Sequence, residues 1–202
     1  MIKPDPHFVL LHDLAQSIFP GLSSYGRSPV GKGTFEVSLL GTSNLQNGLV
    51  EIGEPDRVFV EDRKQVERYM VKTGDVLLTV RGSGFRSAVC SEDVSGYLAS
   101  SNLCVIRLRP DCGIGPYLLN AIFCSPFGQR TLMAISQGSS IVSIRPRALQ
   151  ELMIAVPPSE EAEHLESLCK EMVFLQKSTL MALDIRNRII GELTGAFIQG
   201  RI

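Results

Sequence analysis

The chain has 202 residues and a formal net charge of −1; 44% of it is hydrophobic, 20% charged and 6% aromatic, with no tryptophan. This length suits one domain, or one domain plus an appendage, and the apolar fraction excludes wholesale disorder. No apolar run reaches the roughly 18 residues of a membrane helix, and the start carries no signal-peptide core, so we expect no membrane segment. The near-neutral charge excludes a histone-like polycation, but DNA binding through a local basic patch stays open.

The cysteines and histidines point away from disulfides and metals. The cysteine count is odd and contains no CxxC pair, which favours reduced thiols in a cytoplasmic protein. The three histidines have no ligand spacing with each other or with the cysteines, so we expect no metal site and no cofactor. These residues are Cys90, Cys104, Cys112, Cys124 and Cys169, and His7, His12 and His164.

Short strands dominate the first part of the chain. Alternating and β-branched runs predict strands, whereas Gly-rich polar runs predict loops and turns. The segment at 8–15 is either a strand or a short helix. A loop is expected at 20–34, strands at 35–40, 57–60, 76–80, 86–90 and 103–108, and turns at 41–48 and 71–75.

Helices are predicted at 117–124 and at 128–136, the second as a separate helix or as a continuation of the first. Two last strands follow at 141–144 and 152–156. The pattern predicts an α+β fold: a mixed, largely antiparallel β domain over residues 1–157.

A proline pair at 157–158 marks the boundary between this domain and the segment 158–202, which contains no proline after Pro158 and predicts one long helix. Ser159 is expected to cap it, and Glu160 and Glu161 suit the positive end of its dipole. If unbroken, the helix is about 60 Å long. The alternative is a hairpin of two shorter helices broken at Gly191 or Gly195.

Apolar residues on this segment recur at heptad-like spacing, as in a coiled coil. A domain of this size cannot cover such a helix, so its apolar face needs another copy of the chain or another subunit. The residues expected at that interface are Leu165, Leu168, Met172, Leu175, Ile189 and Leu193.

Three small basic clusters lie beside glycines, serines and amides, which is a pattern suited to DNA contact. Scattered, solvated surface charge is the alternative, and Asn102 is either part of this set or a buried structural amide. Arginine suits guanine, and asparagine or glutamine suits adenine. The candidate DNA-binding residues are Arg27, Lys32, Asn44, Gln46, Asn47, Arg81, Ser83, Arg86, Gln137, Ser139, Ser140 and Arg145.

No group of residues predicts catalysis. Residues 26–32 match the first seven positions of a Walker A loop, but Gly33 stands where a Ser or Thr would reach Mg²⁺. The loop also lacks the preceding strand and following helix that hold phosphates. A nucleotide hydrolase using Lys32 is therefore the weakest hypothesis, and we expect no enzyme.

The order of several motifs is similar to that of the DNA specificity (S) subunit of type I restriction–modification systems. The segments that carry the resemblance cover nearly the whole chain: KTGDVLLT at 72–79, RGSG at 81–84, ASSNLCVIRL at 99–108, PYLL at 116–119, GSS at 138–140 and LQELMIAVPP at 149–158. Early stretches at 11–14 and 43–48 also sit where the family has similar ones.

The resemblance implies a subunit without activity of its own, in which each recognition domain reads half of a split DNA site. It also implies helices that act as spacers and dock adenine-N6 methyltransferase subunits, with a separate restriction/translocase subunit able to join. The chain departs from the family in three ways. The family's helix opens with an acidic residue followed by Gln, and here the acidic residue is present but the Gln is not. The basic content is modest, and there is one domain and one helix where the family has two of each.

This chain therefore resembles a half-subunit, expected to homodimerise and read an interrupted palindrome. The alternative is an adapter that pairs with a full specificity subunit or a methyltransferase without reading DNA. The DNA target and its spacer cannot be predicted from this pattern.

Overall fold

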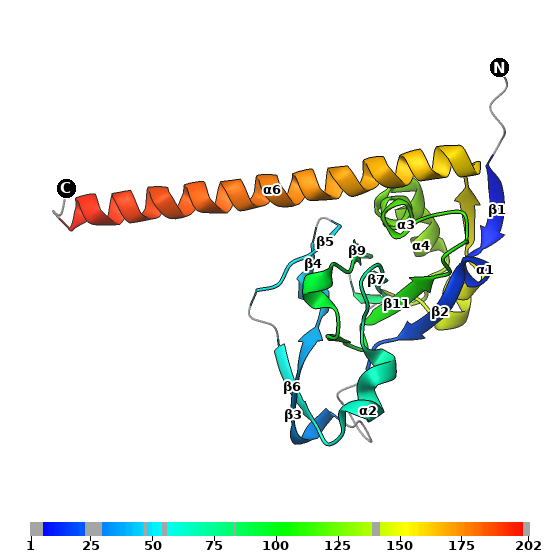
Figure 1. Ribbon diagram of the computed structural model, residues 1–202, viewed down its shortest axis with the longest axis horizontal. Helices are drawn as coiled ribbons and strands as arrows, with labels where there is room; N and C mark the ends of the chain where they lie inside the picture. Colours follow the sequence, from blue (N-terminus) through cyan, green and yellow to red (C-terminus); the bar gives the residue numbers. More distant parts are fainter. Residues whose placement is uncertain are drawn as a thin grey trace.

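One helix, α6 (Ser159–Ile198), runs along the whole molecule, and the rest of the chain is gathered at one end of it (Figure 1). The computed structural model describes residues 6–22, 30–46, 48–53, 56–82, 84–138 and 142–199. The fold is mixed α+β, as predicted, and all of its strand pairs but one are antiparallel within these ranges.

The central sheet has four antiparallel strands in the order β2 (Ala15–Pro20), β11 (Leu103–Leu108), β7 (Val76–Thr79) and β9 (Ser87–Val89). Its middle strands are apolar on both faces because each face meets a separate core. In β7, Val76 and Leu78 face one core, and Leu77 faces the other. Helices α3 (Pro116–Cys124) and α4 (Pro126–Ala134) both contribute to the first core. They are two distinct helices, so the predicted 128–136 helix is separate and does not continue the first.

The first strand pairs with the last strand before the long helix. The segment at 8–15 contains both predicted forms, because β1 (His7–Leu10) runs directly into α1 (Leu11–Leu14). Strand β1 lies antiparallel to β13 (Met153–Val156), which leads into α6 after the proline pair. This pairing anchors the base of α6 to the domain.

A second lobe lies on the side away from α6 (Figure 1). It contains β3 (Val30–Leu40) between β10 (Leu98–Ala99) and β6 (Asp56–Val60). The prediction of a loop over 20–34 is wrong at its end, because β3 begins at Val30; residues 23–29 lie outside the described ranges. Val30 and Phe35 both pair with Val60 in β6, across an irregularity in the register, and the glycines at 31 and 33 mask the strand pattern between them.

Short elements complete the domain. Within the predicted 41–48 turn the structure has a 3₁₀ turn and part of a small hairpin. The remaining elements are η1 (Thr42–Asn44), β4 (Leu45–Gln46), β5 (Leu49–Val50), α2 (Arg63–Val66), η2 (Glu67–Tyr69), β8 (Arg81–Gly82), η3 (Glu92–Val94), β12 (Val142–Ser143) and α5 (Pro146–Gln150).

Helix α6 is continuous, so the hairpin alternative is wrong: Gly191 and Gly195 both lie within it. A helical glycine costs only about 1 kcal/mol relative to alanine, which the rest of the helix tolerates. Ser159 is the first helical residue and makes no capping bond, because Pro158 occupies the cap position. No helix in the described part of the chain is long and apolar enough to cross a membrane.

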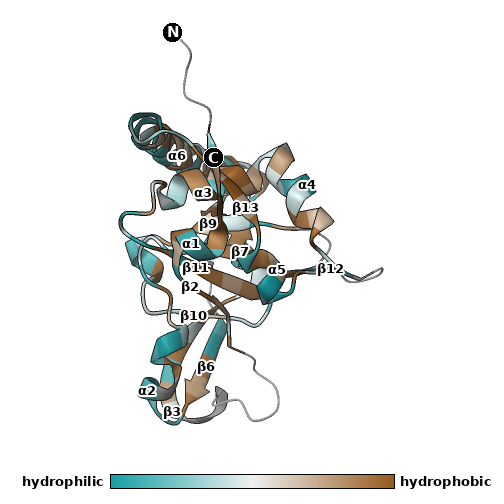
Figure 2. Ribbon diagram, turned by 90° about the vertical axis from the view of Figure 1, so that its right-hand side faces the viewer, coloured by the Kyte–Doolittle hydropathy of each residue, from teal (hydrophilic) through white to brown (hydrophobic). Residues whose placement is uncertain are grey.

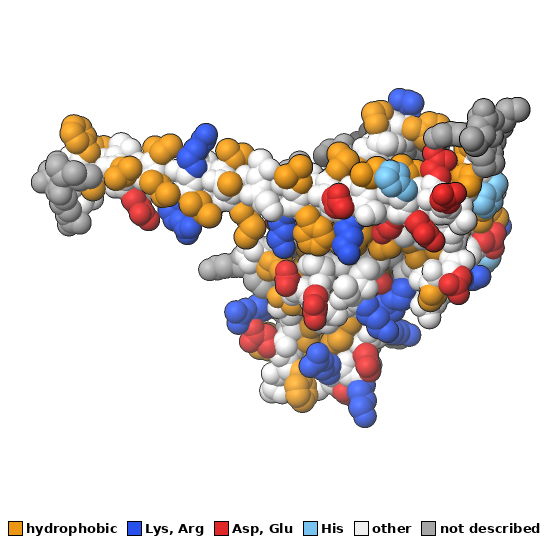
Figure 3. All heavy atoms as spheres, turned by 45° about the horizontal axis from the view of Figure 1, so that its top comes forward, with side chains coloured by type: hydrophobic (Ala, Val, Ile, Leu, Met, Phe, Trp, Pro, Cys, Tyr) orange, Lys and Arg blue, Asp and Glu red, His pale blue; other side chains and the backbone are white. Residues whose placement is uncertain are grey.

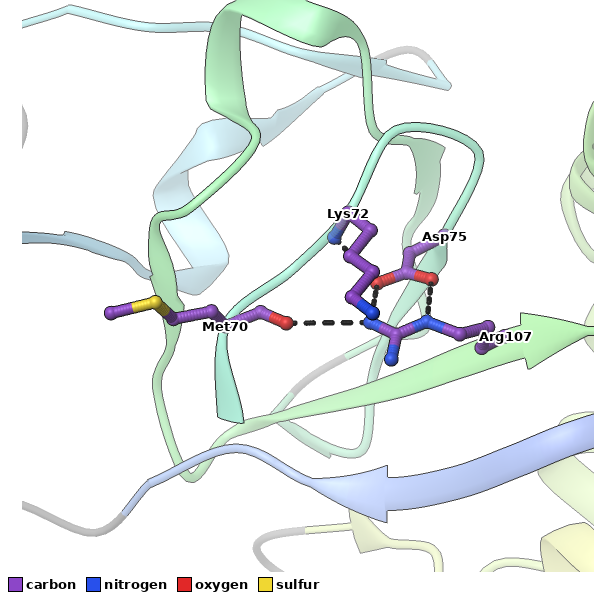
Figure 4. A network of polar contacts seen from close by, with 4 residues as sticks. All are labelled: Met70, Lys72, Asp75 and Arg107. Atoms are coloured by element: carbon purple, nitrogen blue, oxygen red, sulfur yellow. Dashed lines mark hydrogen bonds and ion pairs between the residues drawn. The ribbon is translucent and has the colours of Figure 1, made fainter. Parts of the chain in front are cut away.

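A buried ion pair joins two strands of the central sheet (Figure 4). The Asp75 carboxylate accepts hydrogen bonds from Arg107 Nε at 2.8 Å and Nη2 at 2.7 Å, and from the Lys72 N–H at 2.7 Å. Arg107 Nη2 also donates to the Met70 carbonyl at 3.3 Å. Asp75 is almost fully buried, and its bonds to Arg107 raise the pKa of the guanidinium. The sequence analysis predicted only a turn here.

Replacing Asp75 with Asn should lower the free energy of unfolding by about 3 kcal/mol, because it leaves the Arg107 charge without its partner. The matched control is Glu36→Gln, which breaks the Arg57–Glu36 pair. That pair is shorter, at 2.6 Å, but exposed, so its loss should cost less than about 1 kcal/mol. Urea unfolding followed by circular dichroism measures both, and equal losses would contradict the role of burial.

Candidate nucleic-acid interface

Strands β8 and β12 form a small antiparallel pair. Strand β12 lies at the edge of the domain (Figure 2). Arg81 lies opposite Ser143, and Gln137 forms a bridge on the other side of Ser143. Two backbone hydrogen bonds of 2.8 Å join Gln137 and Ser143. Directly opposed residues of antiparallel segments project to the same side, so these three side chains share one face. We call this surface the β8–β12 face.

The β8–β12 face includes a hollow lined by Thr42, Arg81, Gly82, Asn102 and Ser143. Two backbone bonds hold these segments together: the Val80 N–H donates to the Asn102 carbonyl at 2.9 Å, and the Ile144 N–H donates to the Val80 carbonyl at 3.0 Å. The described residues of the lining offer hydroxyl, amide and guanidinium groups and no carboxylate. Such groups donate and accept hydrogen bonds, as base edges require.

Sequence reasoning missed Thr42 and Ser143. The β8–β12 pairing places Ser143 opposite Arg81, and Thr42, from the distant η1 turn, lines the same hollow. The alternative of a buried Asn102 is wrong, because its side chain is exposed. The sequence signal that could have identified Ser143 as a candidate is its position two residues before Arg145.

The basic and amide side chains of this region point into solvent. Arg81, Gln137 and Arg145 are exposed, and their side chains make no hydrogen bond within the described ranges. Arg147 differs, since its Nε donates to Glu151 at 2.9 Å. The stretch between Asp111 and Glu151 contains no acid, so no carboxylate of that stretch neutralises this surface.

Asn44 and Gln46 do not line the hollow, but their side chains bond to the backbone around Thr42. Asn44 Oδ1 accepts from the Gly41 N–H at 2.8 Å, and its Nδ2 donates to the Glu51 carbonyl at 3.0 Å. Gln46 Nε2 donates to the Ser43 carbonyl at 3.0 Å. These bonds hold the turn that presents Thr42, so the amide of Asn44 is engaged within the protein.

Arg86 is separated from Arg81. Its N–H donates to Thr79 Oγ1 at 2.8 Å, and its Nη1 donates to the Leu45 carbonyl at 3.3 Å. It lines a groove of about 770 Å³ between α6 and α3, whereas Arg81 lines the hollow on the β8–β12 face. The two arginines flank one turn in sequence, but they face different surfaces.

Several candidate residues are not placed. Arg27, Asn47, Ser83, Ser139 and Ser140 lie outside the described residues. Lys32 lies in β3, but its side chain also lies outside what the structure describes. The assignment of these six residues to DNA contact stays a prediction.

The interface residues on α6 divide into two groups. Leu165 is half-buried against the core of its own domain. The other five are 43–69% exposed, and hydrophobic side chains follow the helix to its free end (Figure 3). These five are Leu168, Met172, Leu175, Ile189 and Leu193.

The five cysteines are free, and no cluster of three or more potential metal-ligating His, Cys, Asp or Glu side chains occurs in the described part of the chain. Burial raises the pKa of the Cys104 thiol to about 12 and also raises that of Cys90, so both thiols stay protonated.

No family model and no curated protein matches the sequence. Solved structures do match, and three of them come from type I restriction–modification systems. The HsdS subunit from Thermoanaerobacter tengcongensis has a TM-score of 0.56 at 18% identity, over 90% of this chain and 41% of that one. A structure described for complex assembly and conformational transition of a type I system has a TM-score of 0.59 at 17% identity, over 93% and 45%.

The S subunit from M. genitalium has a TM-score of 0.54 at 14% identity, over 93% of this chain and 44% of that one. The chain therefore has the fold found in type I specificity subunits, domain and long helix included. It spans less than half the length of the structures it matches.

The β8–β12 face depends on Gly82, whose φ of 141° is rarely adopted by residues with a side chain. Nothing lies within 4 Å of the position of an added Cβ, so backbone strain alone opposes substitution. Gly82→Ala should lower the free energy of unfolding by about 1–2 kcal/mol and speed amide exchange in β12. Gly84→Ala, also in open space but without a positive φ, is the control; it should not lower the free energy of unfolding or speed amide exchange in β12. Equal effects would contradict this role of the backbone.

Proposed function

We propose that this protein is a sequence-specific double-stranded DNA recognition subunit of a type I restriction–modification complex. It acts as a homodimerising half-subunit in the cytoplasm and has no catalytic activity of its own. The observation that carries the proposal is the fold, which matches solved specificity subunits over 90–93% of this chain and less than half of theirs.

The β8–β12 face supplies chemistry suited to reading base edges. Arg81 can contact guanine O6 and N7 through two N–H groups, and Gln137 can contact adenine N6 and N7. Ser143 between them can donate or accept. Arg145 and Arg130 are exposed and lie close to these residues in the sequence, and they suit phosphate contacts. Phosphate contacts fix the position of a protein along the duplex but carry no information on base sequence.

The lining of this face supports binding over catalysis. The hollow contains no acid, histidine or cysteine among its described residues, so it offers no general base or nucleophile there. Chemistry on the DNA would then come from an adenine-N6 methyltransferase subunit, and cleavage from a restriction/translocase subunit.

The exposed apolar stripe of α6 supports pairing with a second copy. A two-fold dimer presents two identical β8–β12 faces, so the two half-sites it reads are symmetric and separated by a gap. The same helices would dock the methyltransferase. The proposed target is therefore an interrupted palindrome.

Arg81→Ala should cost about 1–3 kcal/mol of binding and relax the preference at one base pair of each half-site. The measurement is selection from a random double-stranded DNA pool by the full chain with the methyltransferase subunit of its own system. Arg145→Ala should instead weaken all sequences alike and lower the salt dependence of binding.

The matched control is Arg57→Ala, which removes an exposed arginine already paired with Glu36 in the distant lobe. It should leave the selected motif unchanged. A complex that forms but enriches no sequence from the pool would contradict DNA recognition and favour the adapter alternative.

Leu175→Glu should dissociate the dimer, because pairing would bury an unpaired charge. The side chain is largely exposed in the single chain, so the monomer should keep its melting temperature. Lys170→Glu places the same residue on the opposite side of α6 and should leave the dimer intact. Sedimentation velocity measures both, and a dimer that survives Leu175→Glu would refute this seam.

A further inference from the structure

Helix α6 is attached to its own domain along only its first half. Ala162 is buried, and Cys169 packs against the main core. Further along, the Phe174 ring lies 6.4 Å from that of Tyr117. From residue 181 to residue 194, every residue is exposed. The free half therefore points wherever the attached half directs it.

A buried part of the attachment contains a polar contact made by Glu166, which is itself half-buried. The Glu166 carboxylate accepts hydrogen bonds from the backbone N–H groups of Tyr117 at 3.1 Å and Leu118 at 2.7 Å. These groups open α3, whose N-cap residue Gly115 offers no side-chain bond. The first N–H groups of a helix lack partners within it and carry partial positive charge, so a carboxylate from α6 completes α3.

Gly115 leaves the space for this contact. A Cβ at this position would overlap the Glu166 carboxylate. The φ of Gly115 is −96°, which any residue can adopt, so the requirement is for space alone. Burial and, next, the Glu166 charge raise the pKa of the Tyr117 hydroxyl beside the cap.

We propose that Glu166 is a positioning residue: by capping α3, it fixes the angle at which α6 leaves the DNA-reading domain, and so the length of the gap between half-sites. The second part of this inference rests on the proposed function. The capping bonds are directional, whereas the apolar contacts of the attachment allow sliding and tilting. The Lys177–Asp93 pair, at 3.6 Å and exposed, adds little restraint.

The geometry makes the gap sensitive to this angle. From Glu166 to the end of α6 the helix extends for about 48 Å. A tilt of about 10° at the cap would move the free end by about 8 Å, which is the length of roughly 2 base pairs. Loss of the cap would therefore widen the range of gap lengths that the dimer accepts, without changing the residues that read bases.

The first test measures the angle without DNA. Spin labels carried by non-canonical amino acids at the exposed positions Lys64 and Arg188 report the distance between the domain and the free half of α6. Labelled chain is diluted with unlabelled chain, so that each distance lies within one molecule. Wild type should give one narrow distribution, and Glu166→Ala should broaden it by several ångströms.

Gly115→Ala is the second variant, because it displaces the carboxylate while leaving Glu166 in the sequence. It should broaden the distance as Glu166→Ala does, and the double variant should add nothing more. Glu166→Gln, which keeps one carbonyl acceptor, should recover part of the narrow distribution. Glu171→Ala removes an equal charge from an exposed site on α6 and is the matched control.

The second test selects from DNA pools in which the gap between half-sites varies. Wild type should prefer one gap length, whereas Glu166→Ala and Gly115→Ala should accept a range about 2 base pairs wider with the same half-site sequences. A purely structural role would lower enrichment at every gap equally and leave the preferred length unchanged.

The outcomes separate the two proposals. Unchanged distance distributions in both Glu166→Ala and Gly115→Ala overturn the positioning role, whatever happens with DNA. Broadened distances with an unchanged gap overturn the link to half-site spacing. Broadened distances in a protein whose wild type selects no DNA would support the cap and reject the proposed function alone.

Discussion

The attachment of α6 at one end is the constraint on which the use of this fold depends. A helix of 40 residues cannot be covered by the domain beside it, and here the domain covers only its first half. That half is fixed by β13 leading into it, by Ala162 in the core and by Glu166 on α3. The free half gains stability only by pairing, because its apolar side chains otherwise stay in water.

The domain itself is built to hold a small polar face still. The central sheet packs on both sides, and the buried Asp75–Arg107 pair ties the start of β7 to the end of β11. From the far end of β7 the chain passes through Val80 into β8, where Arg81 stands opposite Ser143. Only Val80 therefore separates the β8 side of this face from β7, which is buried along its whole length. Side chains on such a support lose little further freedom when they bind.

The sequence predicted what local pattern controls. Strands β7 and β11, helix α3 and helix α6 follow from apolar runs, the prolines at 116 and 157–158, and heptad spacing. Strand β8 is only two residues long and has no pattern of its own. It exists through its pairing with β12, far along the chain, so local reasoning cannot find that Arg81 lies opposite Ser143. The same limit explains why the sequence groups Arg81 with Arg86, although Arg86 leads into β9 and lines the groove beside α6.

If the β8–β12 face reads DNA as proposed, a single copy offers few base contacts, and a chain of net charge −1 gains little from general attraction to DNA. Half-site binding by one copy would then be weak. In the proposed dimer, two copies joined through α6 would convert the second half-site into an intramolecular contact, whose effective concentration depends on how closely the joined faces match the gap. A flexible joint would spread that concentration over many gaps, whereas a rigid one concentrates it at a single length. Under the proposed function, stiffness at the Glu166 cap would thus substitute for charge and contact area as the source of specificity.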